Sequence, residues 1–279
     1  MEHTSVGVME LITSDEERLA EYLKRHYLEK TNENALPVHP QRNIYSKYIK
    51  RLADILVSFV MLVLTLPFNI IFGICTFFDV GRPIFYKQTR SGRDGKPFTI
   101  VKFRNMNEKK DADGRLLPPS QRVTRFGKFM RKLSLDELLN FWSVFKGDMS
   151  IIGPRPLPVT FTDRMCERHK MRNAVRPGLE CPRYIPNNPD WSKYQNQFEN
   201  DVWYVENIGF TTDLKMLVLL FKLTFNFEKR EKNAQGGGYF VGYDEDCAAT
   251  TLNRFKRLHP EKWEEIRGNR QADPSPHVG

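Results

Sequence analysis

The chain has 279 residues, 40% of them hydrophobic, which is enough to bury a core and argues against disorder throughout. Its 43 Lys and Arg against 34 Asp and Glu give a net charge of +9, which suits anionic lipid headgroups, phosphorylated substrates or nucleic acid. The four cysteines are scattered without a CxxC pair, so their spacing indicates neither a zinc site nor a disulfide framework.

The first 46 residues are polar and contain one predicted helix. This helix covers Ser14–Lys30 and begins Ser-Asp-Glu-Glu, which is typical of a capped N-terminus. The first residues lack an apolar stretch, so we do not expect a cleaved secretory signal, and we expect the soluble mass in the cytosol. We interpret residues 1–46 as an appendage that supplies a packing or dimerisation helix.

An uncharged apolar run, Ile55–Phe78, follows and predicts a membrane segment. A single spanning helix is one interpretation, because about 24 residues at about 1.5 Å rise would cross about 30 Å of hydrocarbon. Pro67 lies in the middle of the run, however, and an interior proline removes a backbone hydrogen bond and kinks a helix. Each half of the run is then too short to span alone.

Basic residues flank the apolar run on both sides. They are Arg42, Lys47, Lys50 and Arg51 before it and Arg82, Lys87, Arg90 and Arg93 after it. Such charges favour the cytoplasmic side, so we favour a re-entrant helix-break-helix over residues 47–80, with the break at Thr65 and Pro67. The Thr65 hydroxyl and the Asn69 amide are the nearest candidates to bond the backbone groups that Pro67 frees.

Beyond the membrane segment, the pattern predicts a β-hairpin and several helices. Two short strands, Pro83–Tyr86 and Phe98–Phe103, are joined by a turn-rich segment. A helical pattern covers Ser120–Phe145. Leu214–Phe227 is apolar but interrupted by lysines, and therefore predicts an interfacial amphipathic helix.

An acidic pair, Asp136 and Glu137, lies in the stretch of the sequence that is richest in residues capable of chemistry. Leucine and aromatic side chains around it share one helical face, which leaves both carboxylates off that face and reachable. One interpretation is structural, since Ser134 with Glu137 three residues later forms a capping box pattern.

Basic residues bracket the acidic pair and support a second interpretation. Arg122, Arg125, Lys128 and Arg131 precede it at every third residue, and Arg155 follows. A helix N-terminus beside arginines is a natural phosphate site, and the same positive groups should keep Asp136 ionised, as a nucleophile requires. The adjacent Glu137 could hold Mg²⁺, whose charge neutralises phosphate oxygens.

Six different motifs follow one another along the chain. They are Lys50-Arg51-Leu52-Ala53-Asp54 before the proline-broken run, Lys102-Phe103-Arg104-Asn105-Met106, Arg131–Leu138, Lys146–Pro156, Val175-Arg176-Pro177-Gly178 and Asp201-Val202-Trp203-Tyr204-Val205. With these motifs, Lys50–Phe225 resembles the small monotopic phosphoglycosyl transferases, also called bacterial sugar transferases.

The resemblance implies a fold and a reaction. It implies an α/β, mostly helical, monotopic membrane protein, in which residues 81–227 form the catalytic domain with interfacial helices and residues 228–279 a C-terminal appendage. It implies transfer of a phosphosugar from a UDP-sugar to undecaprenyl phosphate, with release of UMP, through an aspartyl-phosphosugar. This would be the first membrane step of a capsule, exopolysaccharide, O-antigen or glycoprotein glycan, at the cytoplasmic face of the bacterial inner membrane.

The resemblance also implies roles for individual residues. Asp136 would be the nucleophile and Glu137 the residue that holds Mg²⁺. The substrate-binding set would be Lys102, Arg104, Arg131, Arg155, Arg176 and Asp201. The expected partners are the UDP-sugar, undecaprenyl phosphate and membrane lipid, without nucleic acid, and a homodimer is left open.

Residues 179–190 depart from the family pattern. The family commonly carries Ile-Thr-Gly after the Pro-Gly pair, whereas this chain reads Leu-Glu-Cys-Pro-Arg-Tyr-Ile-Pro-Asn-Asn-Pro-Asp. One alternative to an ordinary family enzyme is therefore an enzyme with a changed donor or impaired activity. A second alternative is a membrane-anchored binding protein without catalysis, whose basic surface holds anionic lipid or nucleic acid.

Overall fold

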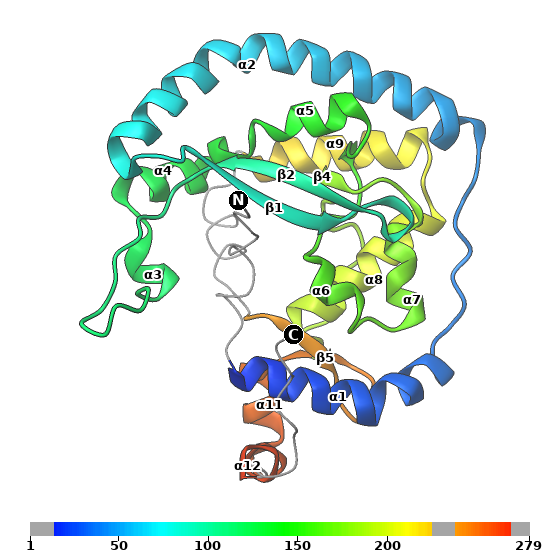
Figure 1. The fold of residues 1–279 in the computed structure, drawn as a ribbon. Helices are drawn as coiled ribbons and strands as arrows, with labels where there is room; N and C mark the ends of the chain where they lie inside the picture. The colour runs from blue at the N-terminus through cyan, green and yellow to red at the C-terminus, as the bar shows by residue number, and fades with distance from the viewer. Residues whose placement is uncertain (1–13, 225–237, 269–279) are drawn as a thin grey trace.

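The computed structural model describes residues 14–224 and 238–268, and these are mostly helical (Figure 1). Within them are three two-stranded sheets: antiparallel β1–β2, parallel β3–β4 and antiparallel β5–β6. The mostly helical character with a small hairpin agrees with the prediction.

Helix α2, Lys50–Val80, follows a short π-helical segment, η2, Tyr45–Ile49. It is helical throughout and curves as one arch over the rest of the molecule (Figure 1). The predicted break at Thr65 and Pro67 is therefore a bend within a single helix. The Thr65 hydroxyl donates to the Met61 carbonyl (2.7 Å), and the Asn69 amide donates to that hydroxyl (3.3 Å). Such back-bonding by a hydroxyl bends helices without ending them.

The faces of α2 are inverted relative to a helix of a water-soluble protein. Its buried side chains are polar: Lys50, Asp54, Ser58, Thr65 and Thr76. Its large apolar side chains are exposed along the whole arch, among them Leu52, Leu56, Phe59, Val63, Leu66, Ile70, Ile74 and Phe78. The segment Tyr45–Val80 is also the one candidate membrane span, by length and composition, in the part of the chain that the structure describes. Apolar side chains facing outward over such a length are typical of a surface that contacts a membrane or another protein.

The predicted hairpin is present, with a longer first strand. Strand β1, Phe85–Ser91, pairs with β2, Pro97–Phe103, around the short 3₁₀ turn η3, Arg93–Gly95. The hairpin lies under α2 (Figure 1), and Gly73 of α2 comes close enough to Phe103 that an added Cβ would be 3.7 Å from its ring.

The predicted helical pattern over Ser120–Phe145 is present, but as several short helices. The segment forms α3, Pro119–Arg122; α4, Arg125–Leu133; a 3₁₀ turn η4, Leu135–Glu137; and α5, Asn140–Lys146. Ser134 adopts a left-handed conformation (φ 57°), which ends α4 and redirects the chain. The capping box with Glu137 does not form, because the Ser134 side chain does not cap η4.

The remaining elements of the family-like region support the site from behind. Strand β3, Ser150–Ile152, pairs in parallel with β4, Gly178–Glu180. Helices α6, Val159–Thr162, α7, Glu167–Lys170, and the 3₁₀ turn η5, Met171–Ala174, pack near α8, Lys193–Glu206.

Helix α9, Phe210–Thr224, is amphipathic, as predicted for this region. Phe210, Leu214, Val218 and Phe221 are exposed, whereas Met216 is buried. The predicted end at Phe227 lies outside the described residues, as does the boundary between residues 227 and 228.

The two predicted appendages pack against each other. Helix α1, Ser14–Glu33, contacts β5, Phe240–Tyr243, and the helices α11, Leu252–Leu258, and α12, Pro260–Gly268; β6 covers Ala249–Thr251. Their shared core contains Leu19, Leu23, Val241, Phe255, Trp263 and Ile266. We call this assembly of α1, β5, β6, α11 and α12 the terminal unit.

Candidate active site

Glu137 accepts charge-assisted hydrogen bonds from two cations. One carboxylate oxygen, Oε1, lies 2.6 Å from Lys102 Nζ and 2.5 Å from Arg155 Nη2. The 3₁₀ turn η4 presents Glu137, strand β2 presents Lys102, and the loop after β3 presents Arg155. Its other oxygen, Oε2, accepts no hydrogen bond within the described part of the chain. Three segments far apart in sequence therefore meet at one carboxylate.

Asp136 has a different set of neighbours. Asn105 Nδ2 donates to Asp136 Oδ2 (3.1 Å), and Arg131 Nη2 donates to Asn105 Oδ1 (2.8 Å). Arg131 thus fixes the Asn105 amide, which in turn fixes the carboxylate. Asp136 is only 6% exposed, so it is less reachable than a helical pattern predicted. We call Asp136, Glu137, Lys102, Arg155, Asn105 and Arg131 the active cluster.

The two adjacent carboxylates have pKa values shifted in opposite directions. Burial raises the pKa of Asp136, which Lys102 opposes and Glu137 reinforces. Burial also acts to raise the pKa of Glu137, but Arg155 and Lys102 outweigh it and lower that pKa to about 2. The cations lower the pKa of Asp136, as predicted, but burial raises it by more, so the pKa lies above its usual value.

A second layer holds Arg155 in place. Arg155 Nη1 pairs with Glu180 of β4 (3.0 Å). Arg172 donates to the Arg155 carbonyl (2.7 Å) and pairs with Asp201 of α8 (2.7 Å). Asp201 is buried against Arg172, so the structure places it behind the cluster, where it supports the Arg155 backbone.

Two residues of the predicted substrate-binding set lie elsewhere. Arg104 donates to the Val80 carbonyl at the end of α2 and pairs with Glu108 (3.1 Å). Arg176 donates through Nε to the Gly147 carbonyl (3.0 Å). The structure thus brings Lys102, Arg131 and Arg155 to the acidic pair and leaves these two arginines outside it.

Sequence reasoning did not place four residues at the site that shape it: Arg90, Asn105, Arg172 and Glu180. Asn105 was at least inside a recognised motif, whereas Glu180 lies in the atypical segment. Arg90 of β1 contributes to lowering the pKa of Glu137, and its own pKa is lowered to about 10 by burial and by Arg155.

Similarity to known proteins covers the same region of the chain. The sequence model described as bacterial sugar transferase matches residues 45–226, which include the whole active cluster. The chain belongs to the bacterial sugar transferase family. The terminal unit lies outside the matched residues.

Named relatives agree with this family. The transferase is 41% identical over 172 residues to a protein of Bacillus subtilis (strain 168) named uncharacterized sugar transferase EpsL, covering 61% of this chain and 84% of the relative. It is 31% identical over 199 residues to a UDP-glucose:undecaprenyl-phosphate glucose-1-phosphate transferase of Klebsiella pneumoniae, covering 67% of this chain and 43% of the relative. A UDP-N-acetylgalactosamine-undecaprenyl-phosphate N-acetylgalactosaminephosphotransferase of Aeromonas hydrophila is 33% identical over 174 residues, covering 60% and 41%.

The transferase therefore spans less than half of two of these relatives and most of the third. Because the family is one of phosphoglycosyl transferases, the protein is a membrane-associated transferase enzyme. The alternative of a binding protein without catalysis is thereby set aside.

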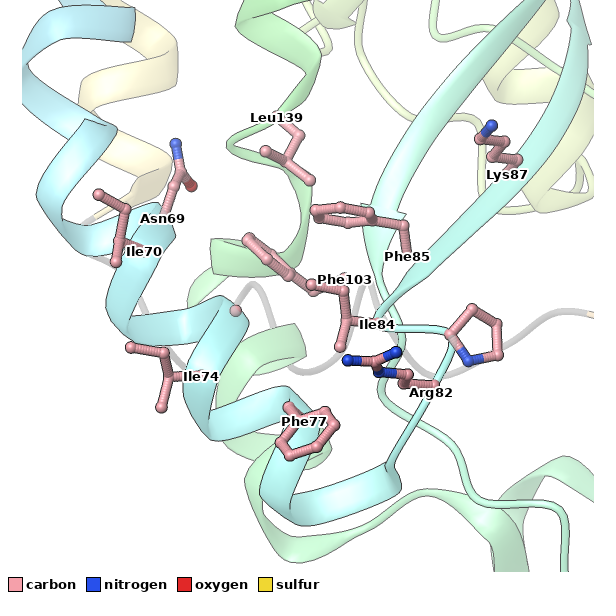
Figure 2. Close-up of a pocket in the computed structure, with 12 residues that line it drawn as sticks. Asn69, Ile70, Ile74, Phe77, Arg82, Ile84, Phe85, Lys87, Phe103 and Leu139 are labelled. Atoms are coloured by element: carbon pink, nitrogen blue, oxygen red, sulfur yellow. The ribbon is translucent and has the colours of Figure 1, made fainter.

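An apolar cavity lies against the membrane helix α2. It has a volume of about 1150 Å³ and lies between the second half of α2 and the hairpin. Figure 2 shows Phe85 and Phe103 of the hairpin, with Leu139 of the segment before α5 beside them; Ile70 and Ile74 of α2 also line the cavity. Three polar side chains also line it: Asn69, Arg82 and Lys87. Phe103 of the lining follows Lys102 in β2, and Leu139 follows Glu137 by two residues, so the same two segments supply residues to the cavity and to the cluster.

The oxygen atoms present fit a Mg²⁺ ion that is held mainly by substrate. The described residues contain no group of three His, Cys, Asp or Glu side chains that could cage a metal. Glu137 Oε2 is unbonded among them, next to Asp136, and Mg²⁺ commonly takes one or two carboxylates together with substrate phosphates and waters.

The atypical segment 179–190 is fastened to α8. Tyr184 stacks on Trp203 (ring centroids 4.4 Å apart), and its backbone amide donates to Asn200 Oδ1 (2.8 Å). Because Glu180 at its start pairs with Arg155, this segment forms one wall beside the active cluster.

Proposed function

We propose that the transferase moves a phosphosugar from a UDP-sugar to undecaprenyl phosphate through a covalent intermediate on Asp136. The products are undecaprenyl-diphosphate-sugar and UMP, and the reaction is the first membrane step of a bacterial surface glycan. The observation that carries the proposal is the acidic pair Asp136 and Glu137, whose pKa values are shifted in opposite directions. Cations lie beside the pair, and an apolar cavity lies at the membrane helix.

In the first step, a carboxylate oxygen of Asp136 attacks the phosphorus that bears the sugar. The bond from this phosphorus to the bridging oxygen breaks, and UMP leaves with the electron pair. In the second step, a phosphate oxygen of undecaprenyl phosphate attacks the same phosphorus and releases the Asp136 carboxylate. Lys102 and Arg155 are suited to hold the donor phosphates, since charge-assisted bonds to phosphate could replace those to Glu137.

Asn105 and Arg131 orient the nucleophile. The amide donates to one oxygen of Asp136, which leaves the carboxylate a fixed direction of attack. Glu137 stays ionised with its pKa near 2 and is the residue that would hold Mg²⁺. The metal would supply positive charge that offsets the charge developing on the phosphate oxygens.

The seating in the membrane is supported by contacts at both ends of α2. Asp54, near its start, accepts from the Ser150 hydroxyl and the Ile151 amide (both 3.0 Å). Val80, at its end, accepts from Arg104. Because both ends of α2 contact the same domain, both ends must lie on the same side of the bilayer. The proposed topology is therefore re-entrant, with α2 dipping into the cytoplasmic leaflet of the inner membrane.

The apolar cavity is a candidate site for the prenyl chain of the acceptor. Its aromatic and aliphatic lining suits hydrocarbon, and Arg82 and Lys87 could meet the lipid phosphate near the active cluster. A donor screen with purified enzyme would identify the sugar, to which the wall formed by residues 179–190 is expected to contribute.

Incubation with the correct UDP-sugar and Mg²⁺, without lipid, tests the mechanism. The peptide that contains Asp136 should gain the mass of one phosphosugar, and UMP should be released in equal amount. Asp136→Asn should abolish both, whereas Asp111→Asn in the exposed loop should keep both. UMP release that strictly requires the lipid acceptor would contradict the covalent route.

A further inference from the structure

A second cavity, of about 700 Å³, lies at the start of α2, away from the active cluster. The linker before η2, the start of α2, the hairpin turn and the segment around Arg176 form its walls.

Positive charge exceeds negative charge in its lining. The basic residues are Arg42, Lys47, Lys50, Arg93 and Arg176, and the acidic ones are Asp54 and Asp94. Lys50 is neutralised by Asp213 at 2.6 Å. The exposed pair of Arg93 with Asp94 spans 3.5 Å and contributes little.

Three of the cations have no carboxylate partner among the described residues: Arg42, Lys47 and Arg176. Arg176 is also held in position by the Gly147 carbonyl, so its remaining donors are preorganised. Burial lowers the pKa of Arg176, and the nearby Arg93 and Arg51 lower it further. An anion in this cavity would relieve that mutual repulsion.

The rim of the cavity is apolar. Ile44 is 74% exposed and Tyr48 is 59% exposed, and both line the cavity. The exposed apolar face of α2 begins immediately after them, at Ile49 and Leu52. A basic interior with an apolar rim at the membrane matches an amphiphile that carries a phosphate and hydrocarbon chains better than it matches a free phosphate.

The cavity is too far from Asp136 to hold the phosphate that reacts there. Lys102 of the active cluster lies five residues along β2 from Pro97, or about 17 Å at strand spacing, and Arg93 lies beyond in the turn. A ligand in this cavity is therefore separate from the donor and the acceptor.

We propose that this cavity binds the headgroup of an acidic phospholipid. Its phosphate lies against Arg176, Arg93 and Lys47, and its acyl chains pass over Ile44 and Tyr48 into the bilayer. The bound lipid anchors the start of α2 at the membrane surface. This inference rests on the proposed membrane seating and not on the proposed chemistry.

Native mass spectrometry of the purified full chain in neutral detergent tests the proposal. The protein is offered equal amounts of phosphatidylglycerol and phosphatidylcholine, and the retained lipids are counted. The wild type should retain phosphatidylglycerol in preference. The double variant Lys47→Gln/Arg93→Gln, which removes two of the three proposed phosphate contacts, should retain at least about tenfold less phosphatidylglycerol. The control Arg125→Gln/Lys128→Gln, with two exposed cations on α4, should match the wild type.

Three outcomes would overturn the proposal. Equal retention of the two lipids by the wild type would show that the cavity does not select acidic headgroups, and an unchanged double variant would show that the selection lies elsewhere. Displacement of phosphatidylglycerol by excess inorganic phosphate would identify a site for a soluble phosphate. Formation of the phosphosugar adduct on Asp136 is measured in the same samples, so failure here leaves the proposed function standing if the adduct still forms. A melting temperature like that of the wild type establishes that the double variant is folded.

Discussion

The active cluster and a second polar cluster, which joins the terminal unit to α7 and α8, are both buried. They differ in whether both oxygens of the central carboxylate are hydrogen-bonded. In the second, the Tyr243 hydroxyl bonds His169 Nδ1 (2.7 Å), and His169 Nε2 bonds Glu199 Oε1 (3.0 Å). Arg168 takes the other oxygen of Glu199 at 2.7 Å. We call Tyr243, His169, Glu199 and Arg168 the anchor cluster. In the active cluster, Glu137 receives both of its cations on one oxygen.

The anchor cluster, with both Glu199 oxygens bonded, fixes the terminal unit against the rest of the molecule. The active cluster, with one oxygen of Glu137 free among the described residues, can exchange partners. Both glutamates have a pKa of about 2, in each case because neighbouring cations outweigh burial. Low pKa alone therefore does not mark the catalytic carboxylate. The unbonded oxygen, and the neighbouring Asp136 with a raised pKa, distinguish the active cluster.

The largest expected effect comes from Glu137→Gln. Glutamine keeps an acceptor for Lys102 and Arg155 but loses the charge that would hold Mg²⁺, so phosphosugar transfer should fall on the order of 10²-fold or more. Turnover is measured as UMP release at saturating donor. The variant should still fold, but with a lower melting temperature, because Lys102 and Arg155 lose the charge that pairs with them.

Glu108→Gln is the matched control, since Glu108 pairs with Arg104 at the surface and should be dispensable. A Glu137→Gln enzyme with full activity and a lowered melting temperature would contradict the comparison. It would show that Glu137, like Glu199, serves to hold its neighbours.

The second-largest effect is expected from Pro67→Leu, which should change the side of the membrane on which the N-terminal segment lies. Pro67→Leu restores a backbone donor and leaves about 24 apolar residues unbroken, which should move part of the population toward a spanning helix. That topology would break the contacts of Asp54 with Ser150 and Ile151, so activity should fall with the fraction that spans.

Cysteine accessibility measures the topology. Leu36→Cys or Lys110→Cys is introduced into a background without the four native cysteines, and intact cells are treated with an impermeant thiol reagent. Both positions should stay unlabelled with Pro67 present, and position 36 should become labelled with Pro67→Leu. Labelling of position 36 with Pro67 present would refute the re-entrant proposal. Leu66→Val is the control for a change at the same depth.

The sequence predicted the parts of this molecule that depend on local pattern. The apolar run and the hairpin were recoverable from composition and spacing. The break after Leu133 was not, because a left-handed serine has no sequence signature as strong as a glycine. Of the predicted bracket of cations, only Arg131 and Arg155 lie at the acidic pair, because Arg125 and Lys128 are exposed and Arg122 bonds the Asn107 carbonyl.

Long-range partners were equally hidden. The pairing of Arg172 with Asp201 joins residues that are 29 positions apart, and helix α1 meets a hairpin more than 200 residues later. The raised pKa of Asp136 also depended on burial, which residue spacing does not report.

A smaller effect should appear in the pH dependence of the active cluster. Asp136 must be deprotonated to attack, and its pKa is raised, so formation of the adduct should be lost as pH falls through that pKa. Arg131 lowers the pKa of Asp136. Arg131→Gln should therefore move the acidic limb of the adduct-formation rate to higher pH, whereas Arg131→Lys should leave it nearer to the wild type. An unmoved limb in Arg131→Gln would mean that a group other than Asp136 controls it.

The smallest effect on catalysis is expected in the anchor cluster, from Tyr243→Phe. The hydroxyl that it removes bonds His169 and accepts from the Cys166 amide (3.2 Å), so two buried polar groups lose a partner at a cost of about 1–3 kcal/mol in the free energy of unfolding. The melting temperature should fall by several °C, while UMP release below the transition should stay within about twofold of wild type, because the cluster fixes position without touching substrate. Tyr239→Phe, in the same strand region but without a described hydroxyl partner, should shift the melting temperature less. If Tyr243→Phe instead cuts turnover sharply at unchanged melting temperature, the terminal unit acts on the chemistry through α8, and the distinction between the two clusters fails.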